Sequence, residues 1–109
     1  MLPKINPTTT NAWHLLQQHF TEIKTVQLKE LFKTDPDRFK KYSLCTDELV
    51  FDYSKNIITG KTKQLLLQLT EECKVKEAIN AMFNGEAINE TEKRAVLHVA
   101  LRNFSNRPV

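Results

Sequence analysis

Residues 88–103 read INETEKRAVLHVALRN, and this stretch decides how the chain can fold. Asn89 and Glu92 have the spacing of a capping box, in which each side chain bonds the backbone N–H of the other residue at the start of a helix. From Ala95 to Leu101, apolar side chains would point in nearly every direction around a period of 3.6 residues. The stretch therefore predicts a helix that the rest of the protein must surround.

Length and composition limit what can surround this helix. A chain of 109 residues fits one domain, and a globular chain of this size buries roughly two-thirds of its unfolded surface. Hydrophobic residues make up 40% and charged residues 27%, which is typical of soluble globular proteins. The formal charge of +3, with both signs interspersed, is too small to indicate a nucleic-acid partner.

The cysteines and the N-terminal residues indicate the compartment. Cys45 and Cys73 are the only cysteines, and no second pair is present to complete a metal site, so we expect free thiols in a reducing cytosol. The N-terminus has no apolar run of signal-peptide length, and nowhere do about 18 consecutive apolar residues occur. We therefore expect a cytoplasmic protein with no membrane partner.

The first half of the chain predicts three short helices. Thr10 or Asn11 can cap the first helix, in which four apolar residues share one face: Trp13, Leu16, Phe20 and Ile23. The second helix is indicated by Leu28, Leu31 and Phe32. The third is expected from Asp37 to Tyr42, with Asp35 as its cap and Pro36 at its first position.

The pattern changes at Ser43, where two β-prone runs flank Thr46-Asp47-Glu48 and predict a small hairpin. Thr59 is then expected to cap a helix with a broad apolar face, formed by Leu65, Leu66, Leu67 and Leu69. A further helix has apolar residues at i, i+3, i+4, i+7 and i+8: Val75, Ala78, Ile79, Met82 and Phe83. Asn84 and Gly85 are expected to end it.

Gly60-Lys61-Thr62 matches the end of a phosphate-binding loop. That motif requires another glycine five residues before Gly60, where Lys55 stands. We therefore interpret these three residues as the start of a capped helix.

The three histidines do not predict a catalytic or metal site. His14 and His19 are five residues apart and diverge on a helix, unlike the i, i+4 pair that chelates a metal; we expect both to be partly exposed. His98, within the apolar stretch, is expected to be a hydrogen-bonded core residue rather than a ligand or base. No nucleophile motif or paired-carboxylate site is recognisable. We therefore assign no catalytic, substrate-binding or metal-ligating residue and no cofactor.

Four blocks in fixed order resemble the N-terminal part of the glucose-6-phosphate isomerase (phosphoglucose isomerase) family. They are DPDRF at 35–39, FDYSKN at 51–56, MFNGEAIN at 82–89, and the stretch at 91–103 that contains RAVLHVALRN. The last block is the longest and the most specific.

The resemblance implies a fold class and an activity for the parent protein. Members interconvert glucose 6-phosphate and fructose 6-phosphate through a cis-enediol, in glycolysis and gluconeogenesis, and are dimers built from two α/β sugar-isomerase domains. Residues 1–109 would be the N-terminal helical segment, mainly α with a small β-hairpin (α+β), without those domains. Its partners would be the remainder of the enzyme and, in the parent, the sugar phosphate and a second subunit. All catalytic residues would lie downstream, so the segment alone is expected to be inactive.

Charged residues in the matched blocks are expected to act as scaffold. Asp52 and Lys55 could pair to fix a turn or could line a cleft, and we favour the pairing. Arg94 and Arg102 would share a helical face and brace downstream loops, with direct phosphate contact less favoured. Glu86 could cap a neighbouring element.

Two alternatives remain open. The chain could be a protein-interaction module that presents the helix at 88–103 to a partner, or a small basic nucleic-acid-binding domain. Under the resemblance, the apolar middle of 88–103 would contact the absent α/β domains. In isolation it would then be exposed, mobile or paired with another copy.

Overall fold

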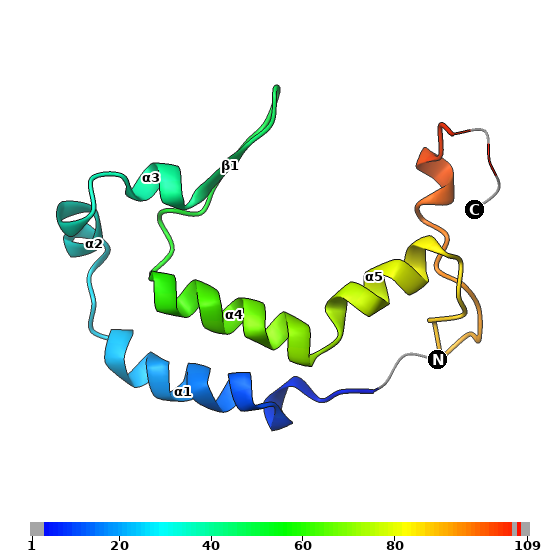
Figure 1. Ribbon diagram of the computed structural model, residues 1–109, viewed down its shortest axis with the longest axis horizontal. Coiled ribbons are helices and arrows are strands. Elements are labelled where there is room, and N and C mark those ends of the chain that lie inside the picture. The colour runs from blue at the N-terminus through cyan, green and yellow to red at the C-terminus, as the bar shows by residue number, and fades with distance from the viewer. Residues whose placement is uncertain (1–3, 106, 108–109) are drawn as a thin grey trace.

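The computed structural model describes residues 4–105 and 107, and it consists of short helices and one β-hairpin (Figure 1). The elements in chain order are the 3₁₀ helix η1 (Pro7–Thr9), α1 (Asn11–Ile23), α2 (Leu28–Thr34), α3 (Arg38–Lys41), β1 (Ser43–Cys45), β2 (Val50–Asp52), α4 (Gly60–Glu72), α5 (Val75–Phe83) and the 3₁₀ helix η2 (Ala100–Arg102). The predicted fold class, mainly α with a small hairpin, is confirmed.

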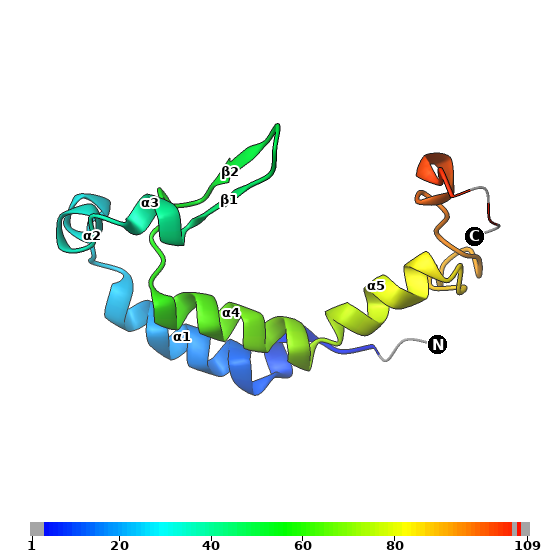
Figure 2. The ribbon, with the colours of Figure 1, turned by 45° about the horizontal axis from the view of Figure 1, so that its top comes forward.

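Helices α1 and α4 form the centre of the molecule as an antiparallel pair that lies side by side in both views (Figures 1 and 2). The start of α1 contacts the end of α4, since the amide of Ala12 donates to Glu72 at 3.1 Å. Near the other end of the pair, His19 contacts Thr62. Ala12 and Leu65 are buried in this contact, with 0% and 8% of their surfaces exposed.

The local signals that start and stop these helices act as predicted. Thr10 caps α1 by accepting a hydrogen bond from the amide of Trp13 at 3.2 Å. Thr59 and Thr62 form a reciprocal capping box at the start of α4. At the end of α5, Gly85 has φ +69°, and the chain forms a Schellman motif in which the amides of Gly85 and Glu86 donate to carbonyls of α5.

Asp35 does not cap α3, and this prediction is wrong. Both carboxylate oxygens of Asp35 bind the ammonium group of Lys41, at 2.9 and 2.8 Å. The N-cap position belongs to Asp37, whose side chain makes no capping bond. Because the Asp35 carboxylate is engaged by Lys41, the helix starts later and is shorter than predicted.

The predicted hairpin is present and extends away from the helices (Figure 2). Strands β1 and β2 pair antiparallel, with Ser43 opposite Asp52 and Cys45 opposite Val50. The amide of Thr46 donates to the carbonyl of Leu49 at 2.8 Å and closes the turn. Every residue of β2 is exposed, so neither face of this ribbon is covered by the part of the chain that the structure describes.

The predicted helix over 88–103 is absent. The side-chain oxygen of Asn89 does accept from the amide of Glu92 at 3.2 Å, but Lys93 has φ 53° and the chain turns back. Asn89 and Arg94 then exchange two backbone hydrogen bonds, of 3.1 and 3.2 Å. Among the residues described beyond that point, only the three residues of η2 are helical.

Lack of cover explains this difference. A helix that is apolar on all sides is stable only when it is enclosed, and here Leu101 is 88% exposed. The turn at Asn89 satisfies backbone groups without requiring a buried environment. His98 is exposed as well, so its predicted place in the core is also wrong.

The chain is open rather than globular. Its radius of gyration is 18.4 Å, whereas a compact domain of this length has about 13 Å. In Figure 1, the segment α2 to β2 and the segment α5 to η2 rise from opposite ends of the α1–α4 pair. The described residues therefore do not enclose a compact core of their own. Among the described residues, no helix has both the length and the apolarity to cross a membrane.

Candidate functional site

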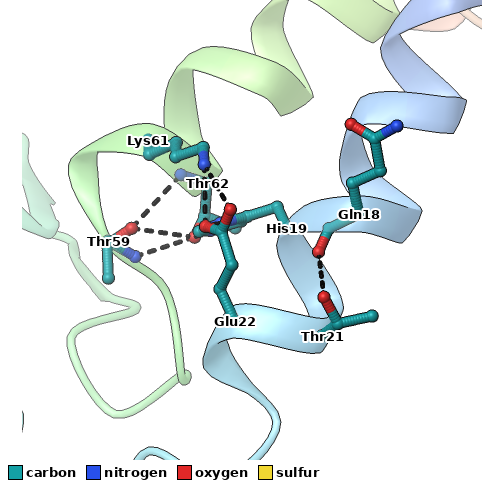
Figure 3. A network of polar contacts seen from close by, with 7 residues as sticks. All are labelled: Gln18, His19, Thr21, Glu22, Thr59, Lys61 and Thr62. Carbon is teal, nitrogen blue, oxygen red and sulfur yellow. Dashed lines mark hydrogen bonds and ion pairs between the residues drawn. The ribbon is translucent and has the colours of Figure 1, made fainter.

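A buried histidine joins α1 to α4 (Figure 3). His19 is 3% exposed, and its Nε2 lies 2.7 Å from the hydroxyl oxygen of Thr62. Its Nδ1 lies 2.9 Å from Oε2 of Glu22, one helical turn along α1. The expectation that His19 is partly exposed is therefore wrong, whereas His14 is exposed.

The partners of His19 define a consistent pattern of donors. Because the Glu22 carboxylate only accepts hydrogen bonds, Nδ1 of His19 carries a proton. In the neutral imidazole Nε2 is then an acceptor, and the Thr62 hydroxyl donates to it. That hydroxyl oxygen accepts in turn from the amide of Thr59 at 3.0 Å. Each side-chain polar atom in this series of hydrogen bonds, which runs from Glu22 through His19 and Thr62 to Thr59, thereby has a partner.

Lys61 extends this network to the surface of α4. Its ammonium group binds both carboxylate oxygens of Glu22, at 2.9 and 2.7 Å. The hydrogen bonds from Lys61 and then from His19 hold the pKa of Glu22 below its ordinary value of 4.5. Four residues from two helices therefore form one polar cluster: His19, Glu22, Lys61 and Thr62, which we call the α1–α4 cluster.

The α1–α4 cluster places a hydroxyl, an imidazole and a carboxylate in a line, as in a nucleophilic relay. However, Thr62 is only 7% exposed, and its oxygen is held in the capping box of α4. Five surface grooves were identified on the described residues, and neither Thr62 nor His19 lines any of these five. The hydrogen bonds of the cluster therefore fix the register of the two helices.

A buried arginine fixes the base of the hairpin. Arg38 is 2% exposed. Its Nε donates to the carbonyl of Ser54 at 2.8 Å, and its Nη2 donates to the carbonyl of Asn56 at 2.7 Å. The guanidinium also lies 4.6 Å from the ring centre of Tyr42. Because a guanidinium is a planar fork of donors, it can bind both carbonyls at once and hold the backbone after β2 in place.

Asp52 and Lys55 pair at the end of β2, as the favoured alternative predicted. Their charged atoms are 3.6 Å apart, and Asp52 also accepts from the amide of Ser54 at 2.9 Å. The bonds from Ser54, followed by the charge of Lys55, hold the pKa of Asp52 below its ordinary value of 3.8. This carboxylate shapes the turn that presents the Ser54 carbonyl to Arg38.

Glu72 completes the contact between α1 and α4 at its other end. One carboxylate oxygen accepts from the amide of Ala12, and the second accepts from the side chain of Gln68 at 2.7 Å. The bond from Ala12 and then that from Gln68 lower the pKa of Glu72 from 4.5. An acidic side chain near a helix N-terminus also complements the helix dipole.

The remaining candidate residues are not brought together. Arg94 pairs with Glu92 at 2.5 Å, and it shares no helical face with Arg102 because the predicted helix is absent. Glu86 supplies a backbone amide to the Schellman motif. Within residues 4–105 and 107, no group of three or more His, Cys, Asp or Glu residues could hold a metal ion.

Large apolar side chains remain exposed on several elements. On α1, Phe20 is 62% exposed and lines a shallow groove with Trp13, Leu16 and Gln17. The predicted sharing of a face by Trp13, Leu16 and Phe20 is therefore correct, but α4 packs against an adjacent face, through Ala12 and His19. On the hairpin, Phe51 is 64% exposed. The described residues thus leave a large apolar surface uncovered.

These features are typical of a segment of a larger protein. Its polar clusters hold its own helices in place, whereas many of its large apolar side chains are not covered by the described residues. Comparison with models of protein families matches residues 52–109 to "Phosphoglucose isomerase". The chain belongs to the phosphoglucose isomerase family, as the resemblance of the four sequence blocks implied.

A curated relative supports the same assignment. The chain is 51% identical over 106 residues to the protein "Glucose-6-phosphate isomerase" of Wigglesworthia glossinidia brevipalpis. The match covers 96% of this chain and 19% of that relative. The chain therefore spans about a fifth of the length of the curated relative that it matches.

Proposed function

We propose that this chain is the N-terminal segment of a glucose-6-phosphate isomerase and contributes scaffold, not catalytic groups, to that enzyme. The observation that carries the proposal is the 51% identity over nearly the whole chain to one-fifth of such an isomerase. The parent would interconvert glucose 6-phosphate and fructose 6-phosphate, in the cytoplasm, as a step of glycolysis and gluconeogenesis.

Isomerisation of this kind moves a proton between adjacent carbons through an enediol, which needs a positioned base and a group that stabilises the developing negative charge. Among the described residues, the buried basic side chains, His19 and Arg38, are both occupied by structural partners. The base and the phosphate-binding groups would therefore come from the remainder of the parent, which would act as a homodimer without a redox cofactor, nucleic acid or membrane partner.

A chimaera tests this proposal. Residues 1–109 replace the matched fifth of the Wigglesworthia isomerase, and isomerase activity is measured for the chimaera and for the isolated chain. We expect the chimaera to be active and the isolated chain to be inactive. Turnover by the isolated chain would contradict the scaffold role, and an inactive but folded chimaera would contradict membership in the functional enzyme.

A binding module is the second candidate function, because so much apolar surface is exposed. It predicts that the isolated chain binds a separate protein and that the chimaera has no isomerase activity. The match of nearly the whole chain to one-fifth of a larger enzyme favours the scaffold instead.

A further inference from the structure

We propose that one exposed face of α5, continued by residues 97–104, is a permanent interface covered by the remainder of the isomerase polypeptide. The face is formed by Val75, Ile79 and Phe83, and we call it the α5 stripe. This inference rests on the proposed function and names the partner of this surface.

The α5 stripe is apolar, regular and uncovered. Val75, Ile79 and Phe83 follow one another at intervals of four residues, so they lie along one face of the helix. They are 39%, 46% and 56% exposed, whereas Ala81 of the same helix is 4% exposed. Helix α5 therefore has one face covered by its own chain and a second apolar face that is not.

The stripe continues onto the segment after the turn at Asn89. Phe83 lines a groove together with Val99, Arg102 and Asn103. Beyond this groove, three large apolar residues are exposed: Leu97 at 47%, Leu101 at 88% and Phe104 at 92%. The helix face therefore adjoins the final segment at the groove that Phe83 and Val99 share. Helix α5 and this segment lie together at one end of the molecule (Figure 1).

The exposed area indicates a permanent interface. The accessible surface is 8951 Å² for a chain of 12.7 kDa, whereas a compact monomer of this mass exposes about 6,200 Å². The excess of about 2,700 Å² is several times the roughly 800 Å² that each partner buries in a standard interface. An excess of this size belongs to a segment that is normally covered within a larger structure.

The remainder of the polypeptide is a better occupant than a second copy. Exposed apolar residues lie on α1, on the hairpin and on α5, and one two-fold partner would cover a single patch. The matched relative has about four-fifths of its length beyond the region that this chain covers, which is enough protein to cover all of them.

Cysteine labelling tests the interface in both contexts. Ile79→Cys and the control Lys76→Cys are introduced separately into the isolated chain and the chimaera, with Cys45→Ser and Cys73→Ser removing the native thiols. Maleimide reaction rates are then compared. We expect Ile79→Cys to react about 100-fold more slowly in the chimaera, since a covered thiol reacts only after local opening. Lys76→Cys, at an exposed position outside the stripe, should react at similar rates in both proteins.

The outcomes separate this inference from the proposed function. An inactive but folded chimaera overturns the proposed function. An active chimaera in which Ile79→Cys reacts as fast as in the isolated chain overturns only the interface. Slow labelling already in the isolated chain, relieved by dilution and accompanied by a dimer in light scattering, would assign the surface to a second copy and also overturn it.

Discussion

His19 and Thr62 are 43 residues apart in sequence, and their side chains meet at 2.7 Å in the contact between α1 and α4. This bond and the capping box of α4 share one hydroxyl group. The start of α4 and its packing on α1 are therefore fixed by the same atom. A change at either residue should affect both the helix and its contact with α1.

Replacing His19 tests how much its contact with Thr62 contributes to stability. We expect His19→Ala to lower the free energy of unfolding by about 2–3 kcal/mol, because a buried hydrogen-bonded side chain is lost and a cavity remains. The control His14→Ala, at an exposed position of the same helix, should change it by less than about 0.5 kcal/mol. Urea unfolding followed by helical circular dichroism measures both, and equal effects would contradict the structural role of His19.

Acid should weaken the contact between α1 and α4. Glu22 has a lower pKa in the folded chain than its ordinary 4.5, so its contribution to stability is complete above that value and is lost as pH falls through the folded-state pKa. Glu22→Gln should therefore flatten the dependence of stability on pH in this acid range. Glu72 and Asp52, whose pKa values are also lowered, should leave a residual slope.

The measurement is a series of urea unfolding curves from neutral pH downward. Glu30→Gln, at an exposed position of α2, serves as the matched control. If Glu22→Gln retains the full acid dependence of the unmodified chain, the link between Glu22 and stability is wrong.

Even a conservative replacement of Arg38 should destabilise the folded chain. We expect Arg38→Lys to cost about 2 kcal/mol, because lysine lacks the planar fork that binds the carbonyls of Ser54 and Asn56. Hydrogen exchange should accelerate at the amide of Tyr53, which donates to Tyr42 at the base of the hairpin. Lys40→Arg, at a side chain that is 82% exposed, should leave that exchange rate unchanged; an equal acceleration there would contradict the role of Arg38.

Lys74 separates α4 from α5 and has a left-handed backbone, with φ 57°. This conformation costs a residue with a side chain roughly 1–2 kcal/mol, and glycine adopts it freely at an entropic cost of about 0.5–1 kcal/mol. We therefore expect Lys74→Gly to be neutral or stabilising. Lys76→Gly, inside α5, should cost about 1 kcal/mol. Thermal unfolding compares the two variants, and a loss at Lys74 equal to that at Lys76 would show that the left-handed turn is not maintained in solution.

Local signals in the sequence predicted local structure. The cap at Thr59, the hairpin around Thr46 and the stop at Gly85 each depend on residues within a few positions, and each is present in the structure. The positions of His19 and Arg38 could not be predicted in this way, because their partners lie 43 and 16 residues away. His19 was expected to be partly exposed, and the burial of both residues follows from contacts with these distant partners.

The segment 88–103 shows that a strong local pattern alone does not determine the structure. Its pattern of apolar residues indicates how the segment would pack if it were enclosed, but the enclosing protein is not among the described residues. The capping interaction between Asn89 and Glu92 forms even so, since it needs no tertiary contact. The four family blocks, in contrast, identified the family correctly without any knowledge of packing.

The antiparallel pairing of α1 and α4 has a consequence for synthesis of the chain. Ala12 and Glu72, which bond at the end of this pair, are separated by 60 residues, and a ribosome adds about 5–20 residues per second. Helix α1 thus emerges several seconds before the helix that covers its inner face. During that interval the inner face, which includes Ala12, is open to chaperones or to neighbouring nascent chains. The polar side chains of His19 and Glu22 on the same inner face would limit such contacts until α4 arrives.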